Sequence, residues 1–354
     1  MILDDAKTIA RLDSGNVRAS INALSDQVAS AWRDARKVRV PASYRSADQI
    51  VVAGMGGSTL GAHLIQSVFG DALKAPFCFI NDYKLPGSVG RKSVVILSSY
   101  SGSTEETLAC GREALRRRAK VMGITSGGAL AKFLKKQKAP AYIFNPVYNP
   151  CKQPRLGLGY MVVGLLALLK SMRALDASAA EVNKLPVLLR PLSAKWSPNV
   201  PVRQNPAKLM ANALDGAVPV IVSAEHLIGN AHIFQNQIHE SAKQFCAAFP
   251  IPELNHHLME GLAYPKEMKN LLAFVFIGSD LYGERIARRM KITQKVLAKQ
   301  GYGYDLWQAS APTRLEQAFE TLAFGSWVSF YMAIQNGADP SNIPWVNFFK
   351  KELG

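Results

Sequence analysis

Short apolar runs alternate with helical stretches along the first half of the chain, and this alternation most restricts how it can fold. Within each run there is no regular exchange of apolar and polar positions. Strands that are apolar on both sides are typical of parallel sheets covered by helices on both faces. We therefore expect a doubly wound α/β domain with strands at Ile50–Ala53, Phe77–Ile80, Val94–Leu97, Lys120–Ile124 and Ala141–Phe144.

The second half of the chain repeats this pattern. It predicts strands at Val218–Ser223, Leu272–Gly278 and Tyr304–Gln308, and helices at Asn230–Ala248, Glu284–Gln300 and Thr313–Asn336. Because 354 residues exceed what one hydrophobic core usually holds, we expect two domains. We place a helical segment that packs on the first domain at residues 1–45, the domains at 46–184 and 207–354, and their connection at 185–206.

The chain is strongly basic, with 42 Lys and Arg against 26 Asp and Glu and a formal net charge of +16. Such a charge raises nucleic acids, membrane surfaces and anionic small molecules as partners. The basic residues, however, come in short clusters such as Arg116–Arg118, Lys135–Lys136 and Arg288–Arg289. Each cluster lies in or near an expected helix, where a solvated helix face explains it. We therefore predict no nucleic-acid partner.

Membrane insertion and secretion are also not expected. The most apolar stretch, Leu156–Leu169, has 14 residues, fewer than the roughly 20 that a membrane span needs, and predicts a buried helix. The N-terminus carries early acids and no apolar segment typical of a signal peptide. The four cysteines, with no CxxC pair and no zinc-like spacing, indicate reduced core thiols and a cytoplasmic protein: Cys78, Cys110, Cys151 and Cys246.

Two loops after expected strands are candidates for binding an anion. Gly54–Ser58, which reads GMGGS, allows backbone N–H groups to approach an anion next to a helix start, although it is neither a GxGxxG fingerprint nor a P-loop. The second stretch, SSYSGSTEET at 98–107, places several hydroxyl residues before a helix. Ser103 or Thr104 could simply cap that helix. A cap explains one or two hydroxyls, so we favour a phosphate cradle that needs neither metal nor lysine.

A third stretch contains candidate acid and base groups. Residues 237–243 read QIHESAK, and residues 252–257 read PELNHH. Glu240 with a histidine of the second segment is a candidate acid/base couple. The alternatives are an ordinary helical ion pair between Glu240 and Lys243 and a structural role for His256 or His257. The spacing does not favour a metal site.

Together these motifs resemble a known family. SYSGSTEET resembles the SYSGNTEET signature of sugar isomerase (SIS) domains, and GMGGS resembles the opening loop of the same domains. The ESAK and PELNH stretches, QPR at 153–155 and the ending DP…FK are similar to the bifunctional phosphoglucose/phosphomannose isomerases. The resemblance covers about residues 46–354 and implies two SIS-type doubly wound parallel-sheet domains with flanking helices.

The resemblance also implies roles for individual residues. Glu240 would move a proton between C1 and C2, and His256, contributed by the neighbouring subunit of a homodimer, would assist ring opening. Arg155 would stabilise the enediolate, and Lys350 would contact the ring oxygen or sugar hydroxyls. No cofactor and no metal are implied. The phosphate of the sugar would be held by Gly57, Ser58, Ser99, Ser101 and Thr104.

The implied reaction is the interconversion of glucose 6-phosphate and fructose 6-phosphate, with mannose 6-phosphate as a further candidate substrate. The chain departs from the family at Ser103, where asparagine is usual, and at His257, a second histidine. The alternative is a non-catalytic SIS sensor of sugar phosphates, which would keep the hydroxyl cradle but could lose the base. The presence of Glu240, His256 and Arg155 favours the enzyme.

Overall fold

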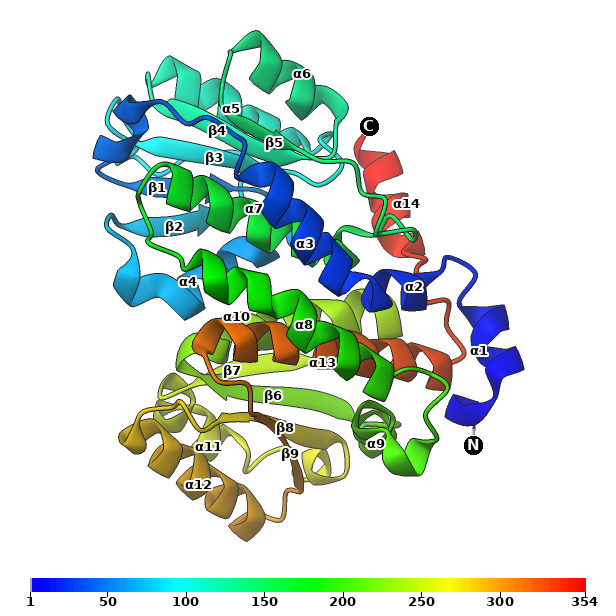
Figure 1. The fold of residues 1–354 in the computed structure, drawn as a ribbon. Helices are drawn as coiled ribbons and strands as arrows, with labels where there is room; N and C mark the ends of the chain where they lie inside the picture. Colours follow the sequence, from blue (N-terminus) through cyan, green and yellow to red (C-terminus); the bar gives the residue numbers. More distant parts are fainter. Residues whose placement is uncertain (1) are drawn as a thin grey trace. The chain divides into compact units, whose positions relative to one another are not determined.

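Five parallel strands form the first sheet of the computed structural model, in the order β2-β1-β3-β4-β5 (Figure 1). All five strands predicted from the apolar runs are confirmed, with ends that differ by at most one residue. The central strands are buried on both faces, as expected for a parallel sheet. Their bounds are β1 Ile50–Ala53, β2 Phe77–Ile80, β3 Val94–Ser98, β4 Lys120–Thr125 and β5 Ala141–Ile143.

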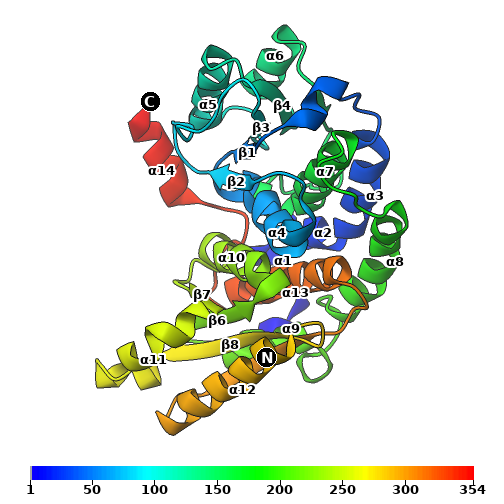
Figure 2. The same ribbon diagram turned by 90° about the vertical axis from the view of Figure 1, so that its left-hand side faces the viewer.

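Helices cover both faces of this sheet, so it is doubly wound as predicted. Helices α5 (Glu105–Arg116) and α6 (Gly128–Lys136) lie on one face, and α4 (Leu60–Phe69) and α7 (Leu158–Ser171) lie on the other (Figure 1 and Figure 2). Helix α3 (Leu24–Ala35) packs on α7. The apolar stretch at 156–169 is thus a buried helix. Within residues 2–354, which the structure describes, no helix is long and apolar enough to cross a membrane.

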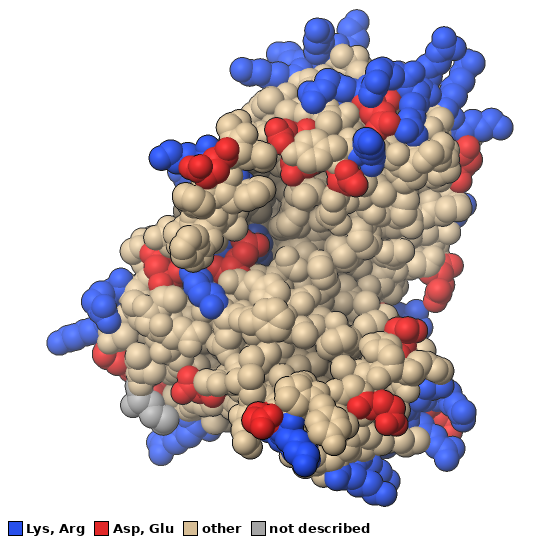
Figure 3. All heavy atoms as spheres, turned by 180° about the vertical axis from the view of Figure 1, so that it is seen from behind, with Lys and Arg blue, Asp and Glu red and all other residues tan. Residues whose placement is uncertain are grey.

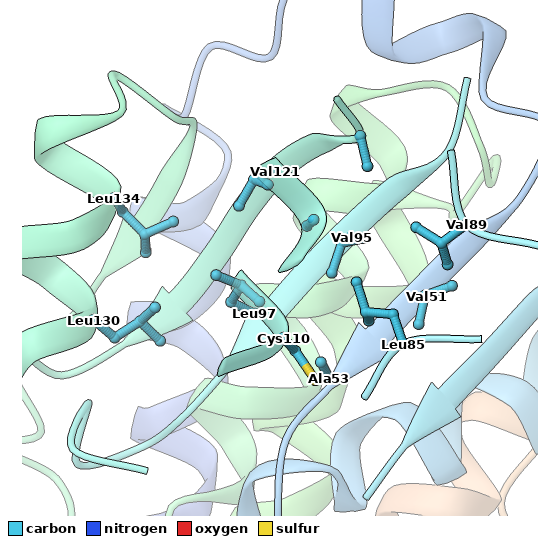
Figure 4. Close-up of a cluster of buried hydrophobic side chains, with 12 residues drawn as sticks. Val51, Ala53, Leu85, Val89, Val95, Leu97, Cys110, Val121, Leu130 and Leu134 are labelled. Carbon is cyan, nitrogen blue, oxygen red and sulfur yellow. The ribbon is translucent and has the colours of Figure 1, made fainter. Parts of the chain in front are cut away.

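A cluster of aliphatic side chains joins the first sheet to α5 and α6 (Figure 4). Alternate residues of the strands point to this face, which is the geometry of extended chains. The members from β1, β3 and β4 meet side chains of the two helices: Val51, Ala53, Val95, Leu97 and Val121 against Cys110, Ala114, Leu130 and Leu134. This packing holds the strand ends in register and thereby positions the loops that follow β1 and β3.

Four parallel strands form the second sheet, in the order β7-β6-β8-β9. The strands β6 (Val218–Ala224), β8 (Leu272–Ser279) and β9 (Tyr304–Ala309) were predicted. Beside the strands lie the helices α9 (Pro206–Ala213), α10 (Ile228–Gln237), α12 (Glu284–Lys299) and α13 (Arg314–Gln335). The short helix α11 (Leu258–Gly261) precedes β8, and α14 (Pro344–Leu353) is the last helix of the chain.

The predicted helix at Asn230–Ala248 is wrong in its second part. Helix α10 ends at Gln237, a π-helical turn follows at Ile238–Ala242, and Lys243 takes a left-handed conformation with φ of 56° that ends the helical path. The chain then forms strand β7 (Ala247–Ile251), which pairs with β6. Pairing with a distant strand therefore overrides the local helical pattern at these residues.

The chain groups into two compact units, which we call the first-sheet unit (Ala23–Leu189) and the second-sheet unit (the residues up to Asn22 together with Arg190–Gly354). The expected N-terminal segment at 1–45 is shared between them. Helices α1 (Ala6–Leu12) and α2 (Val17–Asn22) pack on α13, whereas α3 packs on α7. Helix α8 (Ala179–Lys195) continues into the expected connection at 185–206 despite two prolines, because Val182, Leu185 and Leu189 form a buried stripe at helical spacing.

Leu97 provides a test of this packing. Its side chain is fully buried in the cluster shared by β3, α5 and α6. Replacing it with alanine should lower the free energy of unfolding by about 2–5 kcal/mol, because a cavity remains where the side chain was. Urea denaturation followed by circular dichroism measures the change. The matched exposed aliphatic residue, Val187, should lose no more than about 0.5 kcal/mol on the same substitution. Equal effects at the two positions would contradict the packing described.

Candidate functional site

The loops after β1 and β3 meet where the strand order of the first sheet reverses. Strands β1 and β3 are neighbours, with Ala53 paired to Leu97 at their carboxyl ends, and the chain leaves them toward opposite faces of the sheet. Ligands of open parallel sheets bind at such a reversal, outside the carboxyl ends of the strands. Both loops singled out from the sequence, Gly54–Ser58 and Ser98–Thr104, begin at this point.

Hydrogen bonds join these two loops through Ser58. The hydroxyl of Ser98 donates to the carbonyl oxygen of Ser58 at 2.6 Å, and the backbone N–H of Tyr100 donates to Ser58 Oγ at 2.9 Å. Ser58 is largely buried. Because its oxygen accepts the N–H of Tyr100, the hydroxyl of Ser58 is oriented and keeps its own proton for donation to an anion.

The remaining hydroxyls of the stretch bond to one another. Ser99 Oγ lies 2.7 Å from Thr104 Oγ1, and Ser101 Oγ lies 2.9 Å from Ser103 Oγ. Thr104 occupies the N-cap of α5, but its side chain makes no capping hydrogen bond. Capping therefore does not account for the Thr104 hydroxyl, while Ser99 Oγ accepts the N–H of Gly102 at 3.1 Å. The hydroxyls instead surround the start of α5, whose first N–H groups are suited to an anion.

Close backbone approaches bring Arg155 to these loops. A side chain on Gly57 would meet the backbone nitrogen of Arg155 at 2.8 Å, so only glycine lets the two segments touch. Gly102 has φ of +72°, and a side chain there would overlap the carbonyl oxygen of Gly127. The structure thus brings together six of the predicted residues in the first-sheet unit: Gly57, Ser58, Ser99, Ser101, Thr104 and Arg155.

Arg155 is fully buried in the short 3-10 helix Pro154–Leu156, and its Nη1 donates to Gln153 Oε1 at 2.9 Å. A guanidinium group stays protonated at such a position and can face negative charge that develops during a reaction. The QPR motif is held by Asn149, whose Nδ2 donates to the Gln153 carbonyl at 2.9 Å and to the Tyr100 hydroxyl at 2.7 Å. Burial raises the pKa of Tyr100, so this phenol stays neutral. Sequence reasoning missed the Tyr100–Asn149 pair, which no motif marks.

The corresponding reversal point of the second sheet, at the ends of β6 and β8, is filled by side chains. His226 Nε2 lies 2.9 Å from Gln317 Oε1, which also accepts the Ser279 hydroxyl at 2.5 Å. Gln317 Nε2 in turn donates to Asp280 at 2.6 Å. Burial lowers the pKa of His226, which favours the neutral imidazole. These bonds engage Gln317 and Nε2 of His226, whereas the buried Nδ1 of His226 has no hydrogen-bond partner among residues 2–354.

Glu240 lies in the π-helical turn of the second-sheet unit. Such turns are rare and occur often at functional sites. Lys243, at the end of the turn, directs its ammonium group to three backbone carbonyls: Glu240 at 2.8 Å, Ser241 at 3.1 Å and Asp339 at 2.7 Å. Lys243 therefore links the π-helical turn that contains Glu240 to the segment around Asp339, which precedes α14.

A pocket of about 440 Å³ opens beside Glu240. The first turn of α14 forms one side of it, and Phe245 and Trp345 give it an apolar wall although both are more than two-thirds exposed. Sequence reasoning missed these two side chains, because nothing local marks them. The lining consists of His239, Glu240, Lys243, Gln244, Phe245 and Asn342–Val346.

His256 and Lys350 are not brought to this pocket. His256 lies in the short 3-10 helix Glu253–His256 and is exposed, and its neighbour His257 is exposed as well. Lys350 and Lys351 lie in the last turn of α14 and are also exposed. None of the four lines the pocket beside Glu240. Their assigned roles stay predictions from the resemblance.

One thiol touches the first site, since Cys151 Sγ donates to Asn149 Oδ1 at 3.2 Å. Cys110, Cys151 and Cys246 are buried, Cys78 is half-buried, and all four are free, as expected for reduced thiols. Burial raises the pKa of Cys110 to about 11 and that of Cys246 to about 12, so both stay protonated near neutral pH. Among residues 2–354, no three or more His, Cys, Asp or Glu side chains form a group that could hold a metal ion.

Comparison with known proteins agrees with the two-sheet architecture and the loop motifs. Residues 203–353 match the bacterial phospho-glucose isomerase C-terminal SIS domain. The bifunctional phosphoglucose/phosphomannose isomerase of Caldicellulosiruptor bescii is 29% identical over 339 residues, which span 94% of this chain and 98% of that protein. That of Aquifex aeolicus is 28% identical, over 91% of this chain and 94% of the relative. The chain is thus similar to the bifunctional phosphoglucose/phosphomannose isomerases over nearly its whole length.

Solved structures support the fold expected of this family. A hypothetical protein from Thermus thermophilus aligns with a TM-score of 0.76 over 98% of this chain and 92% of that chain. Its sequence is 16% identical, so the likeness concerns the fold alone. The expected pair of SIS-type parallel-sheet domains with flanking helices is therefore confirmed.

We call the predicted phosphate site the hydroxyl cradle; its residues are Gly57, Ser58, Ser99, Ser101 and Thr104. Binding of inorganic phosphate tests this site. Ser58→Ala removes a buried, oriented donor, so phosphate affinity should fall about tenfold to a hundredfold, the value of one hydrogen bond to a charged group. Isothermal titration calorimetry measures the dissociation constant. Ser46→Ala removes an exposed hydroxyl from the same unit and is the control, because it should leave phosphate affinity unchanged. An equal loss in both variants, or none in Ser58→Ala, would count against the cradle.

Proposed function

We propose that this protein is an aldose–ketose isomerase that interconverts glucose 6-phosphate and fructose 6-phosphate and also accepts mannose 6-phosphate. The proposal is supported by relatives named for these activities, which the chain matches over nearly their whole length. The observation that favours an enzyme over a non-catalytic sensor is Glu240. A sensor needs a phosphate cradle, but it has no need of a half-buried carboxylate held in a π-helical turn beside a pocket.

In this proposal the phosphate of the sugar binds the hydroxyl cradle. Ser58, Ser99, Ser101 and Thr104 donate from their side chains, and Gly57 contributes a backbone N–H group beside them. Neutral donors at a helix start hold a phosphate dianion without the strong charge pairing that would slow its release. The phosphate is the inert end of the substrate, so its binding energy serves to orient the reacting carbons.

Glu240 then acts as the base. Its carboxylate removes the proton from C2 of the aldose, which gives an enediolate, and the resulting carboxylic acid returns that proton to C1. The hydroxyl proton at O2 moves to O1, so atoms and charge balance. Arg155 stabilises the negative oxygen of the intermediate, because a guanidinium group is a fixed positive charge. Since the reaction moves protons only, it requires neither a redox cofactor nor a metal.

His256 and Lys350 complete the proposed site. Histidine can give and take a proton near neutral pH, which ring opening requires. We assign His256 to the site of the neighbouring subunit in a homodimer, and its exposed position outside the pocket beside Glu240 is compatible with that assignment. Lys350 is assigned to the ring oxygen or the sugar hydroxyls, for which an exposed ammonium on α14 is suited.

Glu240→Gln tests the proposed base. Turnover of fructose 6-phosphate should fall by at least about a hundredfold, because the amide cannot accept the proton. Affinity for the substrate should stay within a few-fold, since the cradle is intact. A coupled assay that detects glucose 6-phosphate measures turnover, and deuterium incorporation from heavy water reports proton transfer directly. Glu253→Gln, which changes an exposed carboxylate, is the control. Wild-type protein that binds sugar phosphates but turns none over would refute the enzyme and leave the sensor.

Subunit mixing tests the position of His256. Glu240→Gln and His256→Asn homodimers should each be inactive. After the two are mixed, unfolded and refolded together, each heterodimer would contain one intact site, so about a quarter of wild-type activity should return for random pairing in a twofold dimer. If His256 served its own subunit, every site would lack one group and no activity would return. A monomer in sedimentation velocity would also exclude the shared site.

A further inference from the structure

Exposed basic side chains gather at the edge of the first sheet where its strands begin. In a parallel sheet all strands start at the same edge, so the segments before each strand come together there. Each of these five segments contains exposed Lys or Arg. We call the following set the strand-entry edge: Arg36, Lys37, Arg39 and Arg45 before β1, Lys74 before β2, Arg91 and Lys92 before β3, Arg116 and Arg118 before β4, and Lys135, Lys136 and Lys138 before β5.

Direct contacts confirm that these segments adjoin. The Tyr44 hydroxyl, before β1, donates to the Val121 carbonyl in β4 at 3.0 Å. Gln49 Nε2 donates to the Ser88 carbonyl at 2.6 Å and to Ser93 Oγ at 3.0 Å, which joins the entries of β1 and β3. A groove of about 470 Å³ runs between the entries of β1 and β5, with Lys37, Arg39 and Lys138 on its walls and Asp34 as its acidic member.

Little negative charge opposes these cations. The first-sheet unit, residues 23–189, has 23 Lys and Arg against 10 Asp and Glu, so +13 of the chain's +16 belongs to it. Lys37 pairs with Asp34 at 3.0 Å. For the other members of the strand-entry edge the structure records no ion pair within residues 2–354. Figure 3 shows Lys and Arg crowding the upper margin of this unit.

Two ordinary explanations do not account for the cluster. Basic residues in the last turn of a helix favour the helix dipole, and this covers Arg116 of α5 and Lys135 and Lys136 of α6. It does not cover the cations that lie in loops, such as Arg91 and Lys92. Attraction of a sugar phosphate does not explain them either, because the cradle lies at the opposite edge. Strand β3, with five residues, separates the two edges by about 16 Å.

The chemistry of the edge identifies the partner. The exposed large hydrophobic side chains among residues 2–354 lie outside the five entry segments, and the apolar lining of the groove is limited to Val38, Pro41 and residues 139–141. The edge therefore has no exposed aromatic ring to stack on unpaired bases and no large apolar side chain to enter a bilayer. Five strands span about 19 Å, and duplex DNA carries about eleven phosphate charges over that length. We propose that the strand-entry edge binds the phosphate backbone of double-stranded nucleic acid without reading its sequence.

This proposal changes the prediction made from sequence, which assigned each basic cluster to a separate solvated helix face. It is independent of the isomerase function, because the edge shares no residue with the cradle or with the pocket beside Glu240. Binding of this kind releases counterions from the duplex. The logarithm of affinity should therefore fall linearly with the logarithm of salt, with a slope near −0.9 for each phosphate contacted, about −5 to −7 for six to eight contacts.

The test is binding of a fluorescein-labelled duplex DNA of about 30 base pairs to the full-length protein, followed by fluorescence anisotropy between about 50 and 200 mM salt. In the edge variant, Arg91, Lys92, Lys135, Lys136 and Lys138 become glutamine. In the control variant the same number of exposed cations on α12 become glutamine: Arg285, Arg288, Lys291, Lys295 and Lys299. The net charge changes equally in the two variants. Circular dichroism and thermal melting confirm that both are folded.

The edge variant should bind the duplex at least about a hundredfold more weakly at low salt, with a salt slope shallower by about 4, and the control should lose less than about threefold. Two duplexes of unrelated sequence should bind the wild type equally. The proposal is overturned if the wild type fails to bind at low salt, or if the control variant loses as much affinity as the edge variant. It is also overturned if vesicles of phosphatidylcholine and phosphatidylserine capture the protein while the duplex does not.

Discussion

Burial of the parallel strands on both faces confines the polar chemistry of the first sheet to the two ends of its strands. Helices α5 and α6 on one side and α4 and α7 on the other leave no exposed sheet surface on β1, β3 and β4. A hydroxyl or charge within these strands would have to be buried without water, which costs free energy. Function must therefore lie in the loops. At the carboxyl ends these loops form the hydroxyl cradle, and at the amino ends they form the strand-entry edge.

The carboxyl ends also decide which loops can cooperate. The order β2-β1-β3-β4-β5 makes β1 and β3 neighbours although β2 lies between them in the chain. Because of that order, Ser58 after β1 can accept the N–H of Tyr100 after β3. In the second sheet the same reversal point is closed by His226, Gln317 and Asp280. Similar topology thus supports a hydroxyl-rich pair of loops in one unit and a cluster of histidine, glutamine and aspartate in the other.

The second-sheet unit presents its candidate base by a different device. A π-helical turn displaces Glu240 from the regular path of α10, and the left-handed Lys243 stops the helix and bonds to three carbonyls. Such a turn has less favourable backbone geometry than an α-helix and persists only when its surroundings hold it. The ammonium group of Lys243 provides part of that support, which is a role that the sequence ESAK does not reveal.

Local pattern predicted most of the fold. The apolar runs identified eight of the nine strands that the structure has among residues 2–354, because strands buried on both faces need uninterrupted apolar side chains whatever their neighbours. The ninth, β7, was missed: Ala247–Ile251 follows a helix without a strong break and becomes a strand by pairing with β6. Helix α8 was missed in part, because its prolines suggested a linker, whereas the buried stripe of Val182, Leu185 and Leu189 keeps the helix intact.

For the candidate sites, the sequence and the tertiary structure supplied different information. The sequence by itself determined the residue types, namely the hydroxyl stretch, the GMGGS loop, the ESAK and QPR motifs and the net charge of +16. Only the tertiary structure decided which of them meet. Strand order brought Ser58 to Tyr100, a glycine without a side chain brought Arg155 to Gly57, and parallel strand direction gathered separate basic clusters on one edge. The reason is physical: composition and motifs are properties of neighbouring residues, whereas charge density and cradle geometry depend on distances between residues far apart in the chain.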